Sequence, residues 1–264
     1  MASQISSEEE IGQLENHEEP LISTIVIVIA MQTEALPLVN AFNLTLDEGC
    51  SLFPEEVPWL RYHGTYKSLS LNLVLPGKDP KLGVDSVGTI PASLLTYAVI
   101  QALHPDLIIN AGTAGGFKAK DACIGDVYLA SDVSFHDRRI PIPVFDFYGV
   151  GLKQAHQTPN LQNALTLKVG KLSTGDSLDM SQSDEYSITA NDATIKDMEG
   201  AAIGHVADLF KVPVIYLKAV TDIVDGDKPT AEEFLQNLVS VTAALGLAVT
   251  KVVDFVCGKK CSQL

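Results

Sequence analysis

The feature that most constrains the fold is a series of short apolar runs, rich in β-branched residues, that alternate with longer helical stretches. The runs are Ser23–Ala30, Ser70–Leu75, Asp106–Asn110, Asp126–Ala130, Lys168–Ser173 and Val214–Val220. Several of them are apolar at successive positions, which is typical of strands covered by helices on both faces. Strands that alternate with helices predict an α/β fold with a central, mixed, largely covered β-sheet flanked by helices.

Three helical stretches and the chain ends define the domain organisation. Helices are predicted at Gly88–Leu103, Asn191–Phe210 and Thr230–Val256, the last with one continuous apolar face. Residues 1–20 contain six glutamates, no Lys or Arg and no apolar periodicity, so we predict a disordered acidic tail there. Residues 21–264 then form one domain, since one α/β fold often fills this length.

Composition and charge exclude several classes of partner. The formal net charge is -15, whereas nucleic acids and anionic membranes are held by Lys and Arg. The longest apolar run, Leu21–Met31, is too short to span a membrane and follows an acidic leader, unlike a signal peptide. The four cysteines lack metal-ligand spacing, and no second ligand stands near His136 or His205. We therefore predict a cytoplasmic protein without a metal site that acts on a small molecule.

Polar residues cluster where the predicted strands end. The segments are Met31–Glu34, Ala111–Gly116, Thr174–Leu178 and Thr221–Asp222, with Lys196–Gly200 expected to enter the second helix. Ligands of open α/β sheets bind beyond the carboxyl ends of the strands. We therefore expect Glu34, Thr113, Glu199 and Asp222 to converge on one cleft.

Each of these residues also has a purely structural interpretation. Asp222 taken alone is as well explained as the N-cap of a following helix, and Glu34 as an acidic residue in a first helical turn. The glycines of Gly112–Gly116 do not match a dinucleotide-binding loop, and no glycine loop follows the first strand. The sequence thus argues against a dinucleotide cofactor, and the convergence of several carboxylates favours an active site.

Five motifs, taken in order, resemble those of one known family. They are Met31–Glu34, Asn110–Gly116, Ser173–Asp176, Asp197–Ala201 and Ala219–Asp222. Together they look like the motif set of the 5'-methylthioadenosine nucleosidases of the nucleoside phosphorylase superfamily. The resemblance runs from about Ile25 to the C-terminal helix. It is strongest to the plant branch, because Leu178 stands where bacterial relatives carry a phenylalanine against the adenine.

The resemblance implies roles for the residues around the glycosidic bond. Glu34 matches the carboxylate that orients and deprotonates the attacking water, and Asp222 matches the acid that protonates adenine N7. Met198 and Glu199 match the ribose-binding pair, with Glu199 accepting the ribose hydroxyls. Thr113 matches a small hydroxyl residue near the ribose and the water. A carboxyl that donates a proton near neutral pH needs a raised pKa, which burial supplies.

Other residues are assigned to substrate binding by the same resemblance. Lys218 stands where bacterial relatives place an arginine near the water, which keeps the charge but loses a planar fork. Leu178 and the backbone of Asp179 match the adenine-recognition segment. Phe145 or Phe147 resembles the residue that closes the alkylthio pocket of a neighbouring subunit, so the resemblance implies a homodimer with shared sites.

The implied reaction is hydrolysis of 5'-methylthioadenosine to adenine and 5-methylthioribose in methionine salvage, without metal or organic cofactor. The resemblance also allows S-adenosylhomocysteine as a second substrate. One alternative is a purine nucleoside phosphorylase, but Glu34 after the first strand would repel phosphate, and Lys218 alone is too little to hold it. Another is a non-catalytic storage protein of the same superfamily, which predicts loss of a carboxylate among Glu34, Glu199 and Asp222, and all three are present.

Overall fold

The structure is a computed structural model that describes residues 19–49 and 52–264. The predicted acidic tail, 1–20, therefore lies outside the described residues except for its last two positions. The strands are β1 (Thr24–Val28), β2 (Thr45–Leu46), β3 (Leu60–Tyr66), β4 (Leu69–Leu75), β5 (Leu107–Gly116), β6 (Val127–Phe135), β7 (Lys153–Gln154), β8 (Lys168–Thr174), β9 (Ile195–Asp197) and β10 (Val214–Ile223). The helices are α1 (Gln32–Ala41), α2 (Thr89–Leu103), α3 (Phe145–Val150), α4 (Pro159–Leu165), α5 (Gln182–Ala190), α6 (Gly200–Phe210) and α7 (Thr230–Val256).

The strands form one mixed sheet that closes on itself at one end. Strands β10, β6, β8, β9 and β5 pair in that order, and β10 pairs with β5 again, which completes a ring. From β5 the sheet continues through β1, β4, β3 and β2 as an open extension. β1, β5 and β10 are parallel to one another, so their carboxyl ends lie at the same edge.

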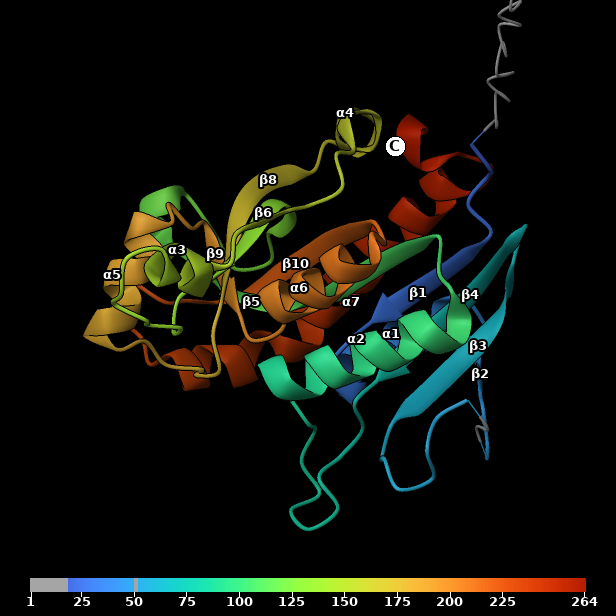
Figure 1. Ribbon diagram of the computed structural model, residues 1–264, viewed down its shortest axis with the longest axis horizontal. Helices are drawn as coiled ribbons and strands as arrows, with labels where there is room; N and C mark the ends of the chain where they lie inside the picture. The colour runs from blue at the N-terminus through green and yellow to red at the C-terminus, as the bar shows by residue number, and fades with distance from the viewer. Residues whose placement is uncertain (1–18, 50–51) are drawn as a thin grey trace, which may run out of the picture.

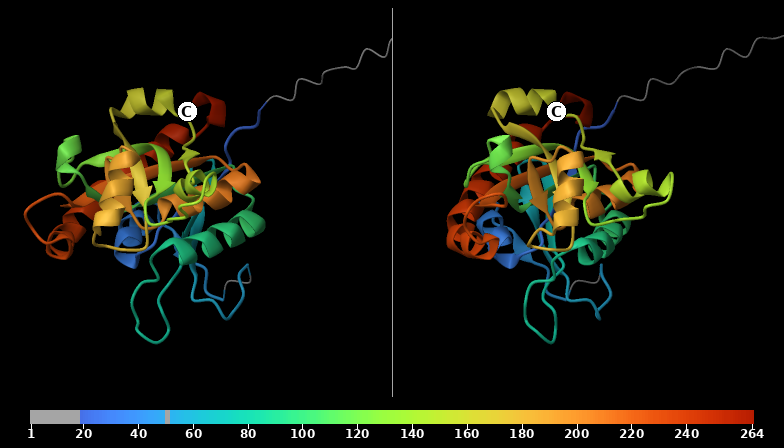
Figure 2. Two further views of the ribbon diagram at one scale, coloured as in Figure 1. Left: turned by 60° about the vertical axis from the view of Figure 1, so that its left-hand side comes forward. Right: turned by 90° about the vertical axis from the view of Figure 1, so that its left-hand side faces the viewer.

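Helices cover both faces of this sheet, as the sequence predicts (Figures 1 and 2). Helices α1 and α7 pack on one face, where Ile25 and Ile27 of β1 join their core. Helices α2 and α6 pack on the other face, with Val26 and Val28 of β1 in that second core. Because alternate residues of a strand point to opposite faces, β1 must be apolar throughout. The predicted α/β fold with a central, mixed, largely covered sheet is confirmed.

Helix α7 covers the length predicted for it. By length and composition alone it could cross a membrane. Its buried residues, among them Leu245, Val249 and Val256, instead belong to the core against the sheet and α1. A core helix has the same apolar composition as a membrane span, so length and composition alone do not distinguish the two.

The prediction of a helix over Asn191–Phe210 is wrong in its first half. Residues Ile195–Asp197 form β9, which inserts between β8 and β5, and α6 begins only at Gly200. The Asp197 carboxylate accepts a hydrogen bond from the backbone N–H of Gly200 (2.8 Å). A side chain that satisfies a free N–H in the first turn marks a helix start, and here it sets the start of α6 after the motif Lys196–Glu199.

Candidate active site

A cavity of about 260 Å³ lies beyond the carboxyl ends of β1, β5 and β10. Six of the predicted site residues line it, namely Glu34, Thr113, Leu178, Met198, Glu199 and Asp222. They come from α1, β5, the β8–α5 segment, the β9–α6 junction and β10. The predicted convergence of polar residues from separate strand ends is therefore what the fold produces.

Glu34 is a buried carboxylate held on both oxygens. Its Oε1 accepts hydrogen bonds from the backbone N–H and the hydroxyl of Thr113, both at 2.7 Å, and its Oε2 accepts from the N–H of Met31 at 3.2 Å. Burial raises the pKa of Glu34, while Thr113 and the nearby Lys218 counteract part of that rise. The residue does stand in the first turn of α1, as the structural interpretation expects, but it also faces the cavity.

Asp222 is a second buried carboxyl group, and one of its oxygens is unpaired. Oδ1 accepts from the Thr221 hydroxyl at 2.8 Å, whereas Oδ2 has no hydrogen-bond partner among the described residues. Burial raises the pKa of Asp222, with smaller opposing effects from Thr221 and Lys196. Asp222 lies within β10 and α7 begins only at Thr230, so it caps no helix. A buried oxygen without a partner favours the protonated carboxyl.

The glycine on the neighbouring strand makes room for Asp222. An ideal Cβ at Gly115 would lie 2.9 Å from Oδ2 of Asp222 and 2.5 Å from Cγ2 of Val224. Any side chain at Gly115 would therefore displace the carboxyl group or Val224. The glycines of this motif serve the close approach of side chains rather than a phosphate loop.

Glu199 stands at the N-cap of α6 and lines the cavity next to Met198. Its Oε1 accepts from the backbone N–H of Gly88, just before α2, at 3.0 Å. Burial and the neighbouring Asp197 raise the pKa of Glu199 to about 7, against the opposing charge of Lys218. Glu199 therefore changes its charge near neutral pH.

Lys218 does not line the cavity but lies directly behind it. Its Nζ is 2.8 Å from Oδ2 of Asp197, and both side chains are fully buried. Burial lowers the pKa of Lys218, but the charges of Asp197, Glu199 and Glu34 outweigh burial and raise it above its ordinary value. Asp197, which also lines the cavity, was not predicted as a site residue. Its signal in the sequence is an acidic residue directly before Met198–Glu199.

Leu178 lines the cavity, whereas Asp179 is exposed and does not. Both residues belong to the segment that follows β8, and Lys196 holds this segment. Lys196 also lines the cavity and was not predicted as a site residue. Its Nζ donates to the carbonyl oxygens of Ser177 (2.6 Å) and Leu178 (2.9 Å). The sequence signal for Lys196 was its position directly before the motif Asp197–Ala201.

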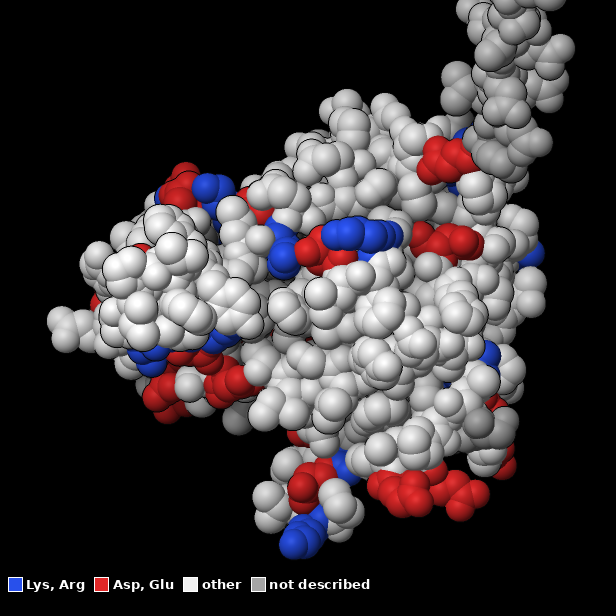
Figure 3. Space-filling view, in the orientation of Figure 1, with Lys and Arg blue, Asp and Glu red and all other residues white. Residues whose placement is uncertain are grey.

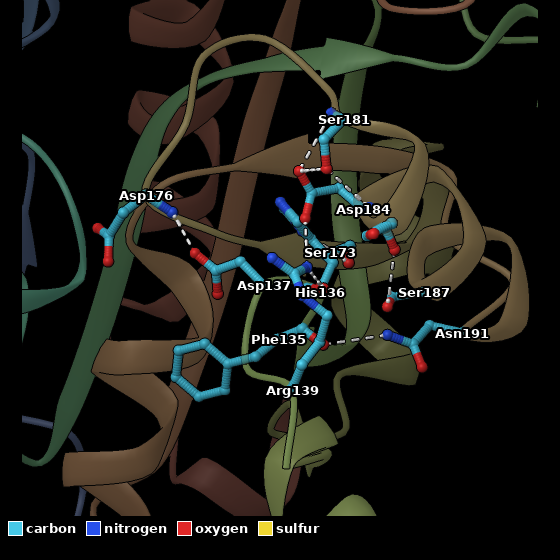
Figure 4. A network of polar contacts seen from close by, with 11 residues as sticks. Phe135, His136, Asp137, Arg139, Ser173, Asp176, Ser181, Asp184, Ser187 and Asn191 are labelled. Carbon is cyan, nitrogen blue, oxygen red and sulfur yellow. Dashed lines mark hydrogen bonds and ion pairs between the residues drawn. The ribbon is translucent and has the colours of Figure 1, made fainter. Parts of the chain in front are cut away.

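Phe145 and Phe147 are not brought to the cavity of their own chain. Both lie on α3, with 53% and 79% of their surface exposed. The loop before α3 is nevertheless tied to the segment after β8, because Asp137 accepts from the N–H of Asp176 at 2.7 Å (Figure 4). A role in a neighbouring subunit's site stays a prediction for both phenylalanines.

A second contact of the same network fixes the loop to α5 (Figure 4). Arg139 donates to Asp184 at 2.7 Å, and His136, which is buried, contacts the Ser173 hydroxyl at 3.1 Å. His136 is thus a buried structural residue in this structure. The network connects the loop before α3 to the segment after β8 and to α5.

Chemically, the cavity presents two carboxyl groups with different environments. Asp222 offers an unpaired oxygen suited to giving a proton, and Glu34 is held by three donors in an orientation suited to accepting one. Glu199 and Asp197 also line the cavity. Such an arrangement fits acid–base cleavage of a bond whose carbon becomes positively charged.

Comparisons with known proteins agree with this site. The profile of the Phosphorylase superfamily matches residues 24–254. A 5'-methylthioadenosine nucleosidase of Arabidopsis thaliana is 66% identical over 92% of this chain and 91% of its own length. A 5'-methylthioadenosine/S-adenosylhomocysteine nucleosidase of the same species is 63% identical over 96% and 98%. The apo structure of the Arabidopsis 5'-methylthioadenosine nucleosidase, 65% identical, superposes with a TM-score of 0.92 and covers 93% of this chain and 100% of that one.

The family resemblance deduced from the motifs is thereby confirmed. The chain belongs to the Phosphorylase superfamily and, within it, to the 5'-methylthioadenosine nucleosidases.

Proposed function

We propose that this protein hydrolyses the N-ribosidic bond of 5'-methylthioadenosine, releasing adenine and 5-methylthioribose. The observation that carries the proposal is the pair of buried carboxyl groups in one cavity, Asp222 with an unpaired oxygen and Glu34 held by Thr113 and Met31. The relatives named above, at 63 and 66% identity, are nucleosidases named for this substrate.

Departure of adenine is assigned to Asp222. Adenine leaves poorly as an anion, so a proton on N7 must neutralise the electrons of the breaking bond. The raised pKa of Asp222, caused mainly by burial, keeps a proton available for this step. Its Oδ1 is engaged by Thr221, so Oδ2 is the oxygen that donates.

Attack of water is assigned to Glu34. The two hydrogen bonds from Thr113 to Oε1 and the one from Met31 to Oε2 fix the carboxylate plane, which a general base needs in order to orient water. Positive charge develops on the ribose as the bond to adenine breaks. The negative charges of Glu34 and Glu199 stabilise it electrostatically.

Ribose binding is assigned to Met198 and Glu199. Glu199 is already oriented by the Gly88 N–H, and as a carboxylate it accepts hydrogen bonds from the ribose hydroxyls. Leu178 supplies an apolar contact for the purine, and the backbone of Asp179 offers the hydrogen-bonding groups that read its edge. Lys218 supports the site from behind by balancing Asp197, Glu199 and Glu34.

Phosphorolysis is disfavoured by the same electrostatics. A phosphate at the position of the attacking water would face the Glu34 carboxylate, and Lys218 is committed to Asp197 in a buried ion pair. A lysine held in this ion pair does not offer a phosphate the two parallel N–H donors that an arginine provides. Water meets neither obstacle.

We propose further that the protein is a homodimer in which α3 of one subunit, through Phe145 or Phe147, closes the alkylthio end of its partner's cavity. The support is an apolar face over α2 and α3 on which charged side chains are sparse (Figure 3). Exposed apolar residues on it are Ile90, Leu94, Tyr97, Val144, Phe145, Phe147 and Tyr148. We expect light scattering to give a dimer and Leu94→Asp to give a monomer with reduced activity; a monomeric wild-type protein would contradict this.

The substrate range and setting are also proposals. We propose that methylthioadenosine is preferred to S-adenosylhomocysteine, which side-by-side kcat/KM values test, with equal values opposing the preference. We place the enzyme in the cytoplasm of a plant cell, in methionine salvage. A fluorescent fusion found in another compartment would contradict that location.

The direct test is to incubate the purified protein with methylthioadenosine and to identify the products by chromatography. We expect adenine and 5-methylthioribose from the wild type. Glu34→Gln should lower kcat by roughly a hundredfold to ten-thousandfold, the usual contribution of a general base. Asp254→Asn is a matched control, since Asp254 pairs with Lys67 at the far end of α7. Equal activity of Glu34→Gln and the wild type would contradict the role of Glu34.

A further inference from the structure

Lys196 is a buried cation at the purine end of the cavity that the reaction described above does not use. It lies on β9, between β8 and β5, and only 4% of its surface is exposed. Its side chain lines the cavity together with Leu178 and Asp222. Burying an ammonium group costs free energy unless hydrogen bonds and opposite charges compensate it, so the compensating groups indicate what the residue does.

The first compensation is a pair of consecutive backbone carbonyls. Nζ donates to the oxygens of Ser177 and Leu178 at 2.6 and 2.9 Å. Hydrogen bonds from a charged donor are stronger than neutral ones. Two of them on adjacent peptide groups fix the segment after β8, and with it the next backbone group, that of Asp179. Residues Asp176 to Asp179 are exposed, and the other contacts of the segment are at its start, where Asp176 is hydrogen-bonded to Asp137 and Thr89.

The second compensation is the surrounding set of carboxylates. Burial lowers the pKa of Lys196, and the acidic groups that oppose burial are Asp222 of β10, Asp197 of β9, Asp179 of the β8–α5 segment and Asp184 of α5. In the other direction, Lys196 is the basic group that lowers the pKa of Asp222, while Glu233 of α7 raises it and the Thr221 hydroxyl lowers it. Lys196 also acts on His136 of the neighbouring loop, whose pKa is lowered mainly by burial.

We propose that Lys196 is a positioning residue for adenine, which holds the Ser177–Asp179 segment against the purine and places a positive charge beside the acid Asp222. The inference rests on the proposed function, because it gives that segment and Asp222 their tasks. Lys196 itself need not touch the substrate. The same ammonium group holds the segment that binds the purine and provides the positive charge next to Asp222. It therefore affects both adenine binding and the protonation of the acid.

Three substitutions separate the two contributions. Lys196→Met removes the hydrogen bonds and the charge, Lys196→Gln keeps a donor without the charge, and Lys196→Arg keeps both. The matched control is Lys171→Met, because Lys171 sits on the adjacent strand in an exposed pair with Asp192. Thermal unfolding followed by circular dichroism establishes that each variant is folded.

Binding of adenine, measured by calorimetry, reports the positioning of the segment without any turnover. We expect Lys196→Met to weaken adenine binding by about tenfold or more, the effect of losing charge-assisted hydrogen bonds. Lys196→Gln should weaken it less, and Lys171→Met should not change it. Unchanged adenine binding in a folded Lys196→Met protein overturns the positioning role.

The pH profile of kcat/KM reports the charge. Asp222 acts while protonated, so activity falls on the alkaline side as it ionises. Loss of the neighbouring cation makes ionisation harder, and we expect the alkaline limb of Lys196→Gln to move up by about one pH unit, whereas in Lys196→Arg it stays at the wild-type position. An alkaline limb that Lys196→Gln leaves in place overturns the electrostatic role.

The two hypotheses fail in different ways. If the wild type binds adenine in a Lys196-dependent manner but hydrolyses no methylthioadenosine, the proposed function fails while the positioning role stands. If the wild type is active and the Lys196 variants match it in adenine binding and pH profile, the proposed function stands and the inference is wrong. A wild type that binds no adenine contradicts both.

Discussion

Replacing Asp222 by asparagine removes the proton of the proposed acid and little else. Asparagine has the same shape, and its side-chain oxygen can still accept from the Thr221 hydroxyl, as Oδ1 of Asp222 does at 2.8 Å. A general acid contributes roughly a hundredfold to ten-thousandfold to the rate. The barrier should therefore rise by about 3–5 kcal/mol.

The same substitution should not destabilise the fold. The pKa of Asp222 is raised by burial above its value of 3.8 in an unfolded chain, so the folded state holds its proton to higher pH than the unfolded state does. The free energy of unfolding then falls as the pH rises above about 3.8 until the buried carboxyl ionises. Asp222→Asn lacks this loss, because an amide does not ionise. The variant should match the wild type at acidic pH and exceed it at alkaline pH.

Adenine release and thermal unfolding, followed across the pH range in the same preparations, test both parts. The expected result is a variant whose kcat is lowered by roughly a hundredfold or more and whose Tm is equal or higher, while Asp254→Asn stays active. An Asp222→Asn protein that keeps wild-type kcat would refute the assignment of the acid. A variant that unfolds more readily at alkaline pH would refute the argument from burial.

Three further predictions concern the groups around the acid. Lys218→Met leaves Asp197 as an unpaired buried charge and should lower the free energy of unfolding by about 3–5 kcal/mol, which urea titration measures; no measurable loss would oppose it. With Glu199 ionising near pH 7, kcat/KM should rise through that pH, and the rise should vanish in Glu199→Gln; an identical profile would count against the ribose role. Gly115→Ala pushes against Asp222 and should lower kcat/KM by about a hundredfold, the cost of a misplacement near 1 Å, whereas an unchanged rate would show that Oδ2 does not act.

Much of the fold follows from strand composition. β1 could be predicted because residues on both of its faces enter a core, so the whole run is apolar. β3 could not, because it is only partly buried near the edge of the sheet, and its sequence is mostly polar. The closed ring could not be predicted either, because it depends on pairing of both β9 and β10 with β5, and β5 lies far from both in the chain.

The site was predictable to the extent that its residues follow strands. Glu34 and Asp222 stand at strand ends, where an α/β sheet binds its ligands, and both line the cavity. Asp197 and Lys196 were missed because their importance comes from tertiary partners, Lys218 for one and the Ser177–Leu178 carbonyls for the other. Both are charged residues of the three-residue strand β9, and the sequence shows neither that they are buried nor which groups balance their charges.

Hydrolysis itself is tested by the dependence of the reaction on phosphate. The purified protein is given methylthioadenosine in phosphate-free buffer and again with phosphate, and the sugar product is identified by mass spectrometry. Water activated by Glu34 predicts adenine and free 5-methylthioribose at the same rate in both buffers. Adenine released only with phosphate, together with a sugar 1-phosphate, would contradict the hydrolase and the role of Glu34.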